Sequence, residues 1–127
     1  MLAFTFPGQG SQKPSMGSEW VDHESWELVD EASQACGRDV SQLLLHADAE
    51  ELKQTRNSQL TTFVLSMVVL DAVERTGVAP NLTAGHSLGE YSALCASGAL
   101  SFEDAVRLVA ERGEAMQVAA DEQDGTM

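Results

Sequence analysis

Hydrophobic residues along the chain follow two spacings, which predict short strands and longer helices. Ala3 to Phe6 is a short apolar run that ends at Pro7-Gly8, and Leu82 to Ala84 is a second run that ends at Gly85. Both runs contain β-forming residues and stop at turn-forming ones, so we predict two short buried strands. Glycines are frequent between Gly8 and Gly17, so the first strand leads into a glycine-rich loop.

The segments between and after these runs carry helical signals. Apolar residues recur at helical spacing, and glycines or capping residues mark the ends. The predicted helices are Ser25–Cys36 with a stop at Gly37, a helical turn at Val40–Leu45, a brief helix after the capping pair Asp48 and Glu51, Gln59–Glu74, Tyr91–Ala96 with a stop at Gly98, and Phe102 to about Ala119 after the capping pair Ser101 and Asp104. The final residues, Asp121–Met127, are acidic and polar and are predicted to form a loop.

The predicted helix Gln59–Glu74 has almost no polar face. Apolar residues occupy most of its positions, so other elements must cover it on most sides. A chain of 127 residues provides little material for that cover. This helix therefore suggests that the complete core needs more chain than these residues supply.

The helix from Phe102 places an arginine on its apolar side. At about 100° per residue, Arg112 falls near the centre of the apolar face, whereas Arg107, Glu111 and Glu114 fall on the opposite side. A guanidinium on an inward face is costly unless it is paired. Two interpretations stay open, a structural ion pair with a buried carboxylate and an anion-binding arginine directed at a site. The predicted apolar face consists of Ala105, Leu108, Val109 and Met116.

Composition and charge limit the possible functions. Hydrophobic residues make up 43% of the chain and the net charge is −13. This charge argues against nucleic acid and against anionic membrane surfaces as partners. No apolar run is long enough to span a membrane, and the first residues lack the basic region of a signal peptide. Cys36 and Cys95 lack metal-ligand spacing, so we predict reduced core thiols, no metal and a cytoplasmic location.

The segment Ala84–Glu90 holds the strongest chemical signal. It reads Ala-Gly-His-Ser-Leu-Gly-Glu and contains the Gly-x-Ser-x-Gly pattern between a predicted strand and a predicted helix, the context of a nucleophile elbow. The sharp turn requires glycine at positions 85 and 89 because a Cβ there would meet neighbouring chain. Ser87 is then a nucleophile beside the helix N-terminus. The alternative is a turn whose serine merely caps the helix.

A serine nucleophile needs a base, and the chain has three histidines for that role. His86 adjoins Ser87, but the residue before the nucleophile normally points to the far side of the turn. His23 and His46 lie in polar surroundings and are predicted to be surface residues. The sequence therefore supplies a nucleophile without an evident base.

Two motifs together point to a family. Phe4-Thr5-Phe6-Pro7-Gly8-Gln9-Gly10-Ser11-Gln12 and Gly85-His86-Ser87-Leu88-Gly89-Glu90 resemble the malonyl-CoA:acyl carrier protein transacylases and the related acyltransferase domains of polyketide synthases. The resemblance implies an α/β fold with a doubly wound parallel sheet and an α/β-hydrolase-like core. It also implies that residues 1–127 are the N-terminal part of the acyltransferase domain. The C-terminal part, with a ferredoxin-like subdomain and the catalytic histidine, is then missing from this chain.

The resemblance assigns roles to particular residues. Ser87 is the catalytic nucleophile, and the backbone amides of Gln9 and Leu88 form the oxyanion hole. Arg112 matches the arginine that pairs with the free carboxylate of the malonyl group, and His86 belongs to the elbow as a substrate-binding residue. Gln59 stands where the family has a glutamine near the site, although Leu60 replaces the usual proline after it.

The resemblance also implies a reaction and its partners. Ser87 takes malonyl from the coenzyme A thioester and passes it to the phosphopantetheine thiol of an acyl carrier protein, with no bound cofactor. The full-length enzyme is expected to be a cytoplasmic monomer of fatty acid biosynthesis, and the isolated chain to be inactive. Alternatives are a polyketide synthase acyltransferase, a serine esterase with the same elbow, and a partner-binding fragment without activity. Met1 lies close to the first motif, which favours a free-standing enzyme.

Overall fold

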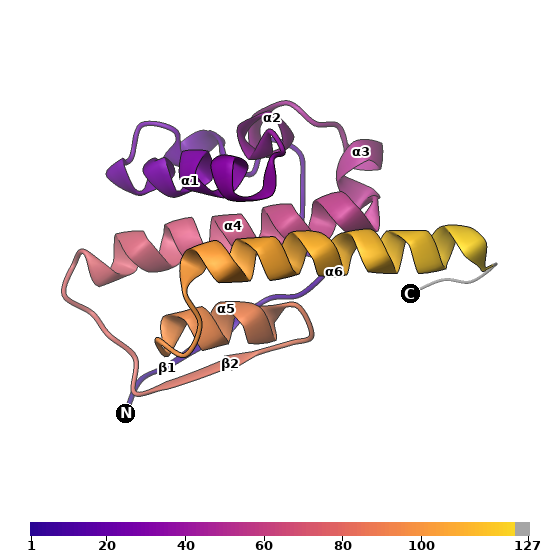
Figure 1. The fold of residues 1–127 in the computed structure, drawn as a ribbon. Helices are drawn as coiled ribbons and strands as arrows, with labels where there is room; N and C mark the ends of the chain where they lie inside the picture. The colour runs from indigo at the N-terminus through magenta and orange to yellow at the C-terminus, as the bar shows by residue number, and fades with distance from the viewer. Residues whose placement is uncertain (124–127) are drawn as a thin grey trace.

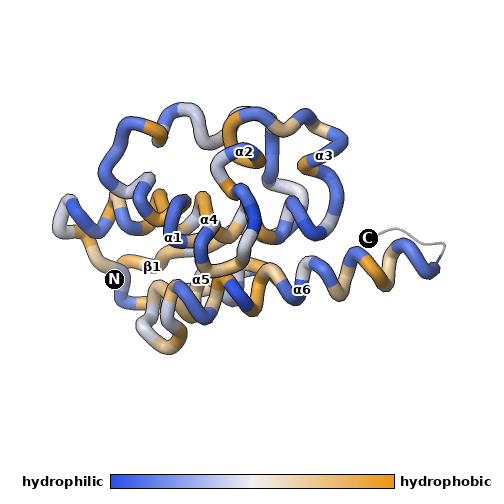
Figure 2. Tube along the Cα trace, turned by 45° about the horizontal axis from the view of Figure 1, so that its top comes forward, coloured by the Kyte–Doolittle hydropathy of each residue, from blue (hydrophilic) through white to orange (hydrophobic). Residues whose placement is uncertain are grey.

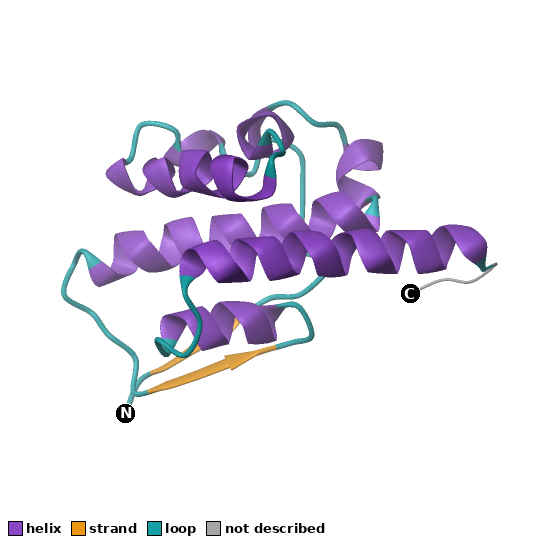
Figure 3. Cartoon of the chain, in the orientation of Figure 1, coloured by secondary structure: helices purple, strands orange, loops and turns teal. Residues whose placement is uncertain are grey.

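The computed structural model describes residues 1–123 of the 127-residue chain. Helices make up most of this part of the chain, and the two strands lie together at one side (Figure 3). In chain order the elements are strand β1 (Ala3–Phe6), the short 3-10 helices η1 (Ser18–Trp20) and η2 (Glu24–Trp26), helices α1 (Glu27–Cys36), α2 (Val40–Leu45), α3 (Ala49–Lys53) and α4 (Thr55–Glu74), strand β2 (Leu82–Gly85), and helices α5 (Gly89–Ala96) and α6 (Phe102–Glu122).

Strands β1 and β2 form a parallel pair. Ala3 pairs with Leu82 and Phe6 with Gly85, so the carboxyl ends of both strands meet at the same edge. Figure 1 shows α5 between this sheet and the long helices α4 and α6, with α1 and α2 beyond them. The predicted α/β class and both predicted strands are confirmed, but the prediction that the strands are buried is wrong, because all their residues except Phe6 are exposed or half-buried. Among residues 1–123 the sheet has these two strands, with the helices of Figure 1 layered on one side of it.

Helix α4 runs through the centre of the core, as its apolar sequence predicts. Leu60, Phe63, Val64 and Val68 are fully buried against residues of α1, α5 and α6. Hydrophobic positions also dominate β1, whereas along α6 they alternate with hydrophilic ones (Figure 2). One side of α4 carries the core, and its remaining side faces β1 across the groove that is described below.

The predicted start of α4 at Gln59 is wrong by one helical turn. The helix begins at Thr55, because the polar residues before Gln59 are buried and find partners there. Asn57 Nδ2 donates to the carbonyl of Glu51, and Arg56 pairs with Glu114 of α6 at 3.1 Å. A polar run that suggests a turn in sequence is therefore the first turn of a buried helix.

Helix α6 differs from its prediction in its inward face and in its end. The fully buried side chains are Ala105, Val106 and Val109, whereas Leu108 is 44% exposed. At about 100° per residue, Arg112 therefore lies at the margin of the buried face rather than at its centre, and it is half-buried. The helix continues to Glu122, so the predicted loop is wrong at Asp121 and Glu122, and Asp124–Met127 lie outside the described residues.

The predicted capping residues and stops are confirmed. Asp48 accepts a hydrogen bond from the Glu51 amide at the start of α3, and Ser101 accepts one from the Asp104 amide at the start of α6. Gly37 after α1 and Gly98 after α5 have φ angles of +71° and +82°, a left-handed conformation that favours glycine. Local chemistry therefore sets these helix ends.

Two further features concern the cysteine side chains and the hydrophobicity of the helices. Both cysteines, Cys36 and Cys95, are free thiols, half-buried against the main core. Within residues 1–123, no helix combines the length and the hydrophobicity that a membrane crossing requires.

The Ser101 cap yields a test of helix α6. We expect Ser101→Ala to lower the free energy of unfolding by about 1 kcal/mol, because the Asp104 amide loses its acceptor. Ser97→Ala is the matched control, since its hydroxyl donates to the Leu94 carbonyl within α5 and caps no N-terminus. Urea denaturation followed by circular dichroism measures both variants. Equal midpoints for the two variants would contradict the assigned cap.

Candidate active site

Ser87 sits in a strained turn that close backbone packing enforces. Its φ angle is +51°, a left-handed conformation that is rare for residues with a side chain. A Cβ on Gly85 would lie 1.9 Å from the Gly89 carbonyl oxygen, and a Cβ on Gly89 would lie 2.3 Å from the Phe6 carbonyl oxygen. The turn therefore excludes side chains on both glycines, as the elbow pattern predicts, and it presents Ser87 at the surface.

The loop after β1 packs directly on this turn. The His86 amide donates to the Phe6 carbonyl at 3.2 Å, which extends the pairing of the strands past Gly85. A Cβ on Gly8 would lie 2.5 Å from the His86 carbonyl oxygen, so the two segments touch through their backbones. Gln9 and Ser87, far apart in sequence, are brought together because parallel strands end at the same edge.

Backbone amides at the site have hydrogen-bonding capacity to spare. The carbonyls of His86, Ser87 and Leu88 accept the first bonds of the turn and of α5. No acceptor within residues 1–123 pairs with the amides of Ser87 and Leu88, nor with that of Gln9. Leu88 buries its side chain completely, so its backbone is held at the N-terminal end of the helix. Such amides attract negative charge.

Arg112 reaches the serine from the middle of α6. Its Nη2 donates to Ser87 Oγ at 3.1 Å, and its Nη1 donates to Gln59 Oε1. The guanidinium carbon lies 5.5 Å from the centre of the Tyr91 ring, a cation–π distance. No carboxylate of residues 1–123 forms an ion pair with Arg112, so the structural ion pair considered from the sequence is not found there.

Two glutamines continue the chain of hydrogen bonds away from the arginine. Gln59, which is 1% exposed, donates from Nε2 to Gln9 Oε1 at 3.2 Å. Gln9 donates from its own Nε2 to Thr55 Oγ1 at 3.3 Å. The structure thus joins Ser87, Arg112, Gln59 and Gln9 in one network, although Leu60 follows Gln59 in place of the expected proline.

A glycine lets the two long helices approach closely at this network. A Cβ on Gly113 would lie 3.2 Å from both Arg56 Cα and Gln59 Cβ, which is tighter than ordinary side-chain contact. Glycine at this position lets α6 lie against α4 where Arg112 meets Gln59. Because the two helices lie this close, the Arg112 side chain can reach Gln59 of α4.

No histidine takes the place of a base in the described part of the chain. His23 accepts a hydrogen bond from the Ser25 amide, His46 ends α2, and both are exposed, as predicted. His86 is also exposed and lies against Gly8, and Ser87 Oγ has no hydrogen bond to it. Within residues 1–123, no group of histidine, cysteine and carboxylate side chains is arranged to hold a metal ion.

Sequence reasoning missed three residues at the site. Tyr91 follows Ser87 by four residues, a spacing that places both on one side of the turn and helix, so this signal was available. Thr55 precedes Gln59 by the same spacing, but its position inside a helix was not predicted. Gly113 follows Arg112 and carries no signal of its own, because helix contact decides its role.

A serine on a strained strand–turn–helix, beside unpartnered amides and an arginine without a carboxylate partner, is suited to acyl transfer. Residues 3–127 match the acyl transferase domain family, and the chain belongs to that family. It is 47% identical over 128 residues to the malonyl CoA-acyl carrier protein transacylase of Bacillus subtilis strain 168, covering 99% of this chain and 40% of that protein.

Solved structures agree with this assignment. The acyl-carrier-protein S-malonyltransferase of Burkholderia pseudomallei is 44% identical with a TM-score of 0.86, over 92% of this chain and 39% of that one. A malonyl transacylase solved in complex with the acyl carrier protein of a type II polyketide synthase is 39% identical with a TM-score of 0.85, over 92% of this chain and 39% of that one. The chain therefore spans about two-fifths of the length of each of these relatives.

The thiol on α5 yields a prediction about competing nucleophiles. Burial raises the pKa of Cys95 to about 11, because the charged thiolate is disfavoured away from water. Below that pH the group is mainly the unreactive thiol, with roughly one thiolate in a thousand at pH 8. We expect iodoacetamide at pH 8 to alkylate Cys95 about a hundredfold more slowly than glutathione.

Peptide mass spectrometry over time measures this rate, and Cys95→Ala identifies the signal that Cys36 contributes. In urea the Cys95 rate should rise to that of glutathione, since the burial is lost. Rapid alkylation of Cys95 in the folded chain would contradict the prediction.

Proposed function

We propose that this chain is the N-terminal portion of a malonyl-CoA:acyl carrier protein transacylase and carries its nucleophile, its oxyanion hole and its carboxylate-binding arginine. The observation that carries the proposal is the hydrogen bond from Arg112 to Ser87 Oγ at 3.1 Å, made by a guanidinium with no carboxylate partner in residues 1–123. A cation held at a nucleophile suits an acyl group that bears its own negative charge.

The proposed first half-reaction is attack by Ser87 Oγ on the thioester carbonyl of malonyl-CoA. The carbonyl oxygen takes up negative charge, and the amides of Leu88 and Gln9 stabilise it. The carbon–sulfur bond then breaks, and coenzyme A leaves as a thiol that takes the proton from the serine. In the second half-reaction the phosphopantetheine thiol of the carrier protein attacks the seryl ester and regenerates the free hydroxyl.

Arg112 gives the proposed site its selectivity. In the malonyl ester, one carbonyl carbon and one methylene group separate Ser87 Oγ from the free carboxylate. The guanidinium therefore releases the hydroxyl and binds that carboxylate, while Gln59 and Tyr91 hold its position. An acetyl group offers no such partner, so the arginine favours the dicarboxylic acyl group. His86, exposed beside the serine, is a proposed further contact for the substrate.

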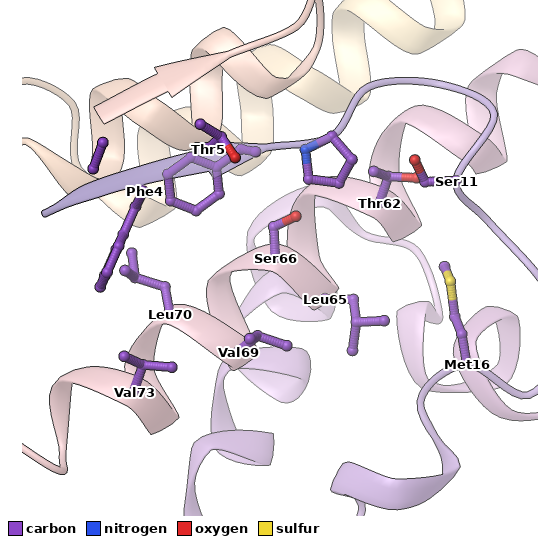
Figure 4. Close-up of a pocket in the computed structure, with 13 residues that line it drawn as sticks. Phe4, Thr5, Ser11, Met16, Thr62, Leu65, Ser66, Val69, Leu70 and Val73 are labelled. Carbon is purple, nitrogen blue, oxygen red and sulfur yellow. The ribbon is translucent and has the colours of Figure 1, made fainter. Parts of the chain in front are cut away.

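The base and the cover of the site are proposed to lie in a further part of the protein. Ser87 is exposed, and a seryl ester in contact with water would be hydrolysed rather than transferred. An apolar groove of about 480 Å³ also separates β1 from α4 (Figure 4). Its lining includes Phe4, Leu65, Val69, Leu70 and Val73.

We infer that the rest of the polypeptide fills this groove, completes a doubly wound sheet along β1 and supplies the histidine. Relatives that extend well beyond the matched region support this interpretation. The ferredoxin-like subdomain belongs to that further part, and the full-length enzyme is proposed to act as a cytoplasmic monomer.

The carrier protein is the proposed acceptor, and the setting is fatty acid biosynthesis. The net charge of −13 means that this segment repels an acidic carrier, so the docking surface lies mainly elsewhere. The similarity to a transacylase of a type II polyketide synthase supports polyketide synthesis as the second setting for the same reaction. An esterase would have no use for an arginine that binds a carboxylate.

Intact-protein mass spectrometry after mixing with malonyl-CoA tests the proposal. The assay uses the chain alone and the chain co-expressed with the remaining three-fifths of the Bacillus subtilis relative. We expect a malonyl adduct on Ser87 in the combined preparation and its loss in Ser87→Ala. An adduct of equal size in Ser87→Ala, or none in any folded preparation, would overturn the proposal.

Substitution of the arginine tests selectivity. We expect Arg112→Ala to slow malonylation of Ser87 by about 10- to 100-fold, because the malonyl carboxylate loses one charged hydrogen-bonding partner. Acetylation from acetyl-CoA should be unchanged or faster. Arg107→Ala is the matched control, because Arg107 lies on the same helix and pairs with Glu103 at the surface. Equal losses of malonylation and acetylation in Arg112→Ala would indicate a structural role and contradict the assignment.

A further inference from the structure

The loop that carries the proposed oxyanion amide makes few hydrogen bonds to the rest of residues 1–123. At its two ends the loop is held by hydrogen bonds, from the His86 amide to the Phe6 carbonyl and from the Ser15 hydroxyl to the Leu45 carbonyl. Between these ends its hydrogen bonds are local, within the loop itself. Within residues 1–123, the exceptions are the two bonds of the Gln9 side chain. Gly8 packs on the His86 carbonyl at the start of the loop, and beyond that contact the Gln9 side chain holds the loop to the rest of the described residues.

Two residues of α4 hold that side chain. Thr55 and Gln59 are four residues apart, so they lie on the same face of the helix, one turn from each other. Gln9 bridges them, donating to Thr55 Oγ1 at 3.3 Å and accepting from Gln59 Nε2 at 3.2 Å. Thr55 is 8% exposed and Gln59 is 1% exposed, so water competes little for these bonds.

The direction of the network follows from the arginine. A guanidinium donates hydrogen bonds and accepts none, so it fixes the Gln59 oxygen toward Arg112 and the Gln59 amide nitrogen toward Gln9. The Gln9 oxygen must then face Gln59, which turns the Gln9 amide nitrogen toward Thr55. The network needs an acceptor at its end, and the threonine hydroxyl provides it.

The geometry points to Thr55 as a positioning residue for the oxyanion hole. Its hydroxyl bonds to the Gln9 side chain and not to the serine, so it acts through Gln9, whose backbone amide is proposed to stabilise the developing negative charge. The catalytic consequence of this inference rests on the proposed function. The positioning of the loop by Thr55 rests on the hydrogen bonds alone. Loss of the acceptor at Thr55 would leave the Gln9 amide group with one anchor and the loop freer to move.

Hydrogen exchange of the full 127-residue chain tests the loop directly. We expect Thr55→Val, which keeps the shape of the side chain and removes the acceptor, to speed exchange of the amides between Gly8 and Gln12 about fivefold, the effect of one hydrogen bond. Thr55→Ser should exchange like the unchanged chain. Thr61→Val is the matched control, because Thr61 is buried in the same helix and bonds to the Asn57 carbonyl.

A second variant covers the case in which Thr55→Val folds poorly. Gln9→Asn shortens the side chain by one methylene, so it cannot reach both residues of α4, while Thr55 stays in place. It should speed exchange of the same loop amides. Wild-type exchange rates in this loop for both folded variants would overturn the inference.

The rate of Ser87 malonylation gives the catalytic readout. In a preparation that malonylates Ser87, Thr55→Val should lower kcat about tenfold or more with KM nearly unchanged, because a displaced oxyanion donor affects the transition state more than binding. Thr55→Ser should restore kcat. A change in KM alone, or no change, would overturn the role. Absence of malonylation in the unchanged protein counts against the proposed function, and the exchange measurement still decides whether Thr55 holds the loop.

Discussion

The close backbone contact between two strand ends is the constraint on which the rest of the structure depends. Gly89 approaches the Phe6 carbonyl, and Gly85 approaches the Gly89 carbonyl, at distances that leave no room for a side chain. This contact forces Ser87 into its left-handed conformation and places the loop after β1 against the turn after β2. The proposed nucleophile and the loop beside it are thus joined before any side-chain contact is considered.

The long helices add the charged part of the site to this backbone arrangement. Helix α4 is buried along most of its length, so its position is set by the core. Gly113 lets α6 lie close to it, and Arg112 then reaches both Gln59 and Ser87. A half-buried arginine with neutral partners keeps its charge available for an anionic group. The same cation in an ion pair would have little capacity left for a substrate.

Three features of the described residues support the proposal that a further portion of chain belongs to this site. The serine is exposed, β1 and β2 have each other as their hydrogen-bonded neighbours within residues 1–123, and an apolar groove lies along β1. These three features lie on the sheet and beside it, whereas the helical side of the molecule is well packed. They are consistent with the proposal that one further portion of chain supplies both the catalytic base and the cover for the ester.

Local sequence determined the elements whose signals are local. Strand β1 ends just before Pro7 and strand β2 ends at Gly85, the caps Asp48 and Ser101 start their helices, and the glycine pattern around Ser87 predicts the turn. These features depend on backbone conformation and on neighbours a few residues away. Helical periodicity also predicted an inward Arg112, although the residue lies at the margin of the buried face and not at its centre.

Tertiary packing decided the remaining features. Thr55, Arg56 and Asn57 joined α4 because residues outside the helix bond to their polar groups. Leu108 turned outward because the contact with α4 centres α6 on Val109 and Gly113. Thr55 entered the site for the same reason, whereas the four-residue spacing of Tyr91 from Ser87 is visible in the sequence. Such choices depend on which helix lies beside which, and a linear pattern of polar and apolar residues does not contain that information.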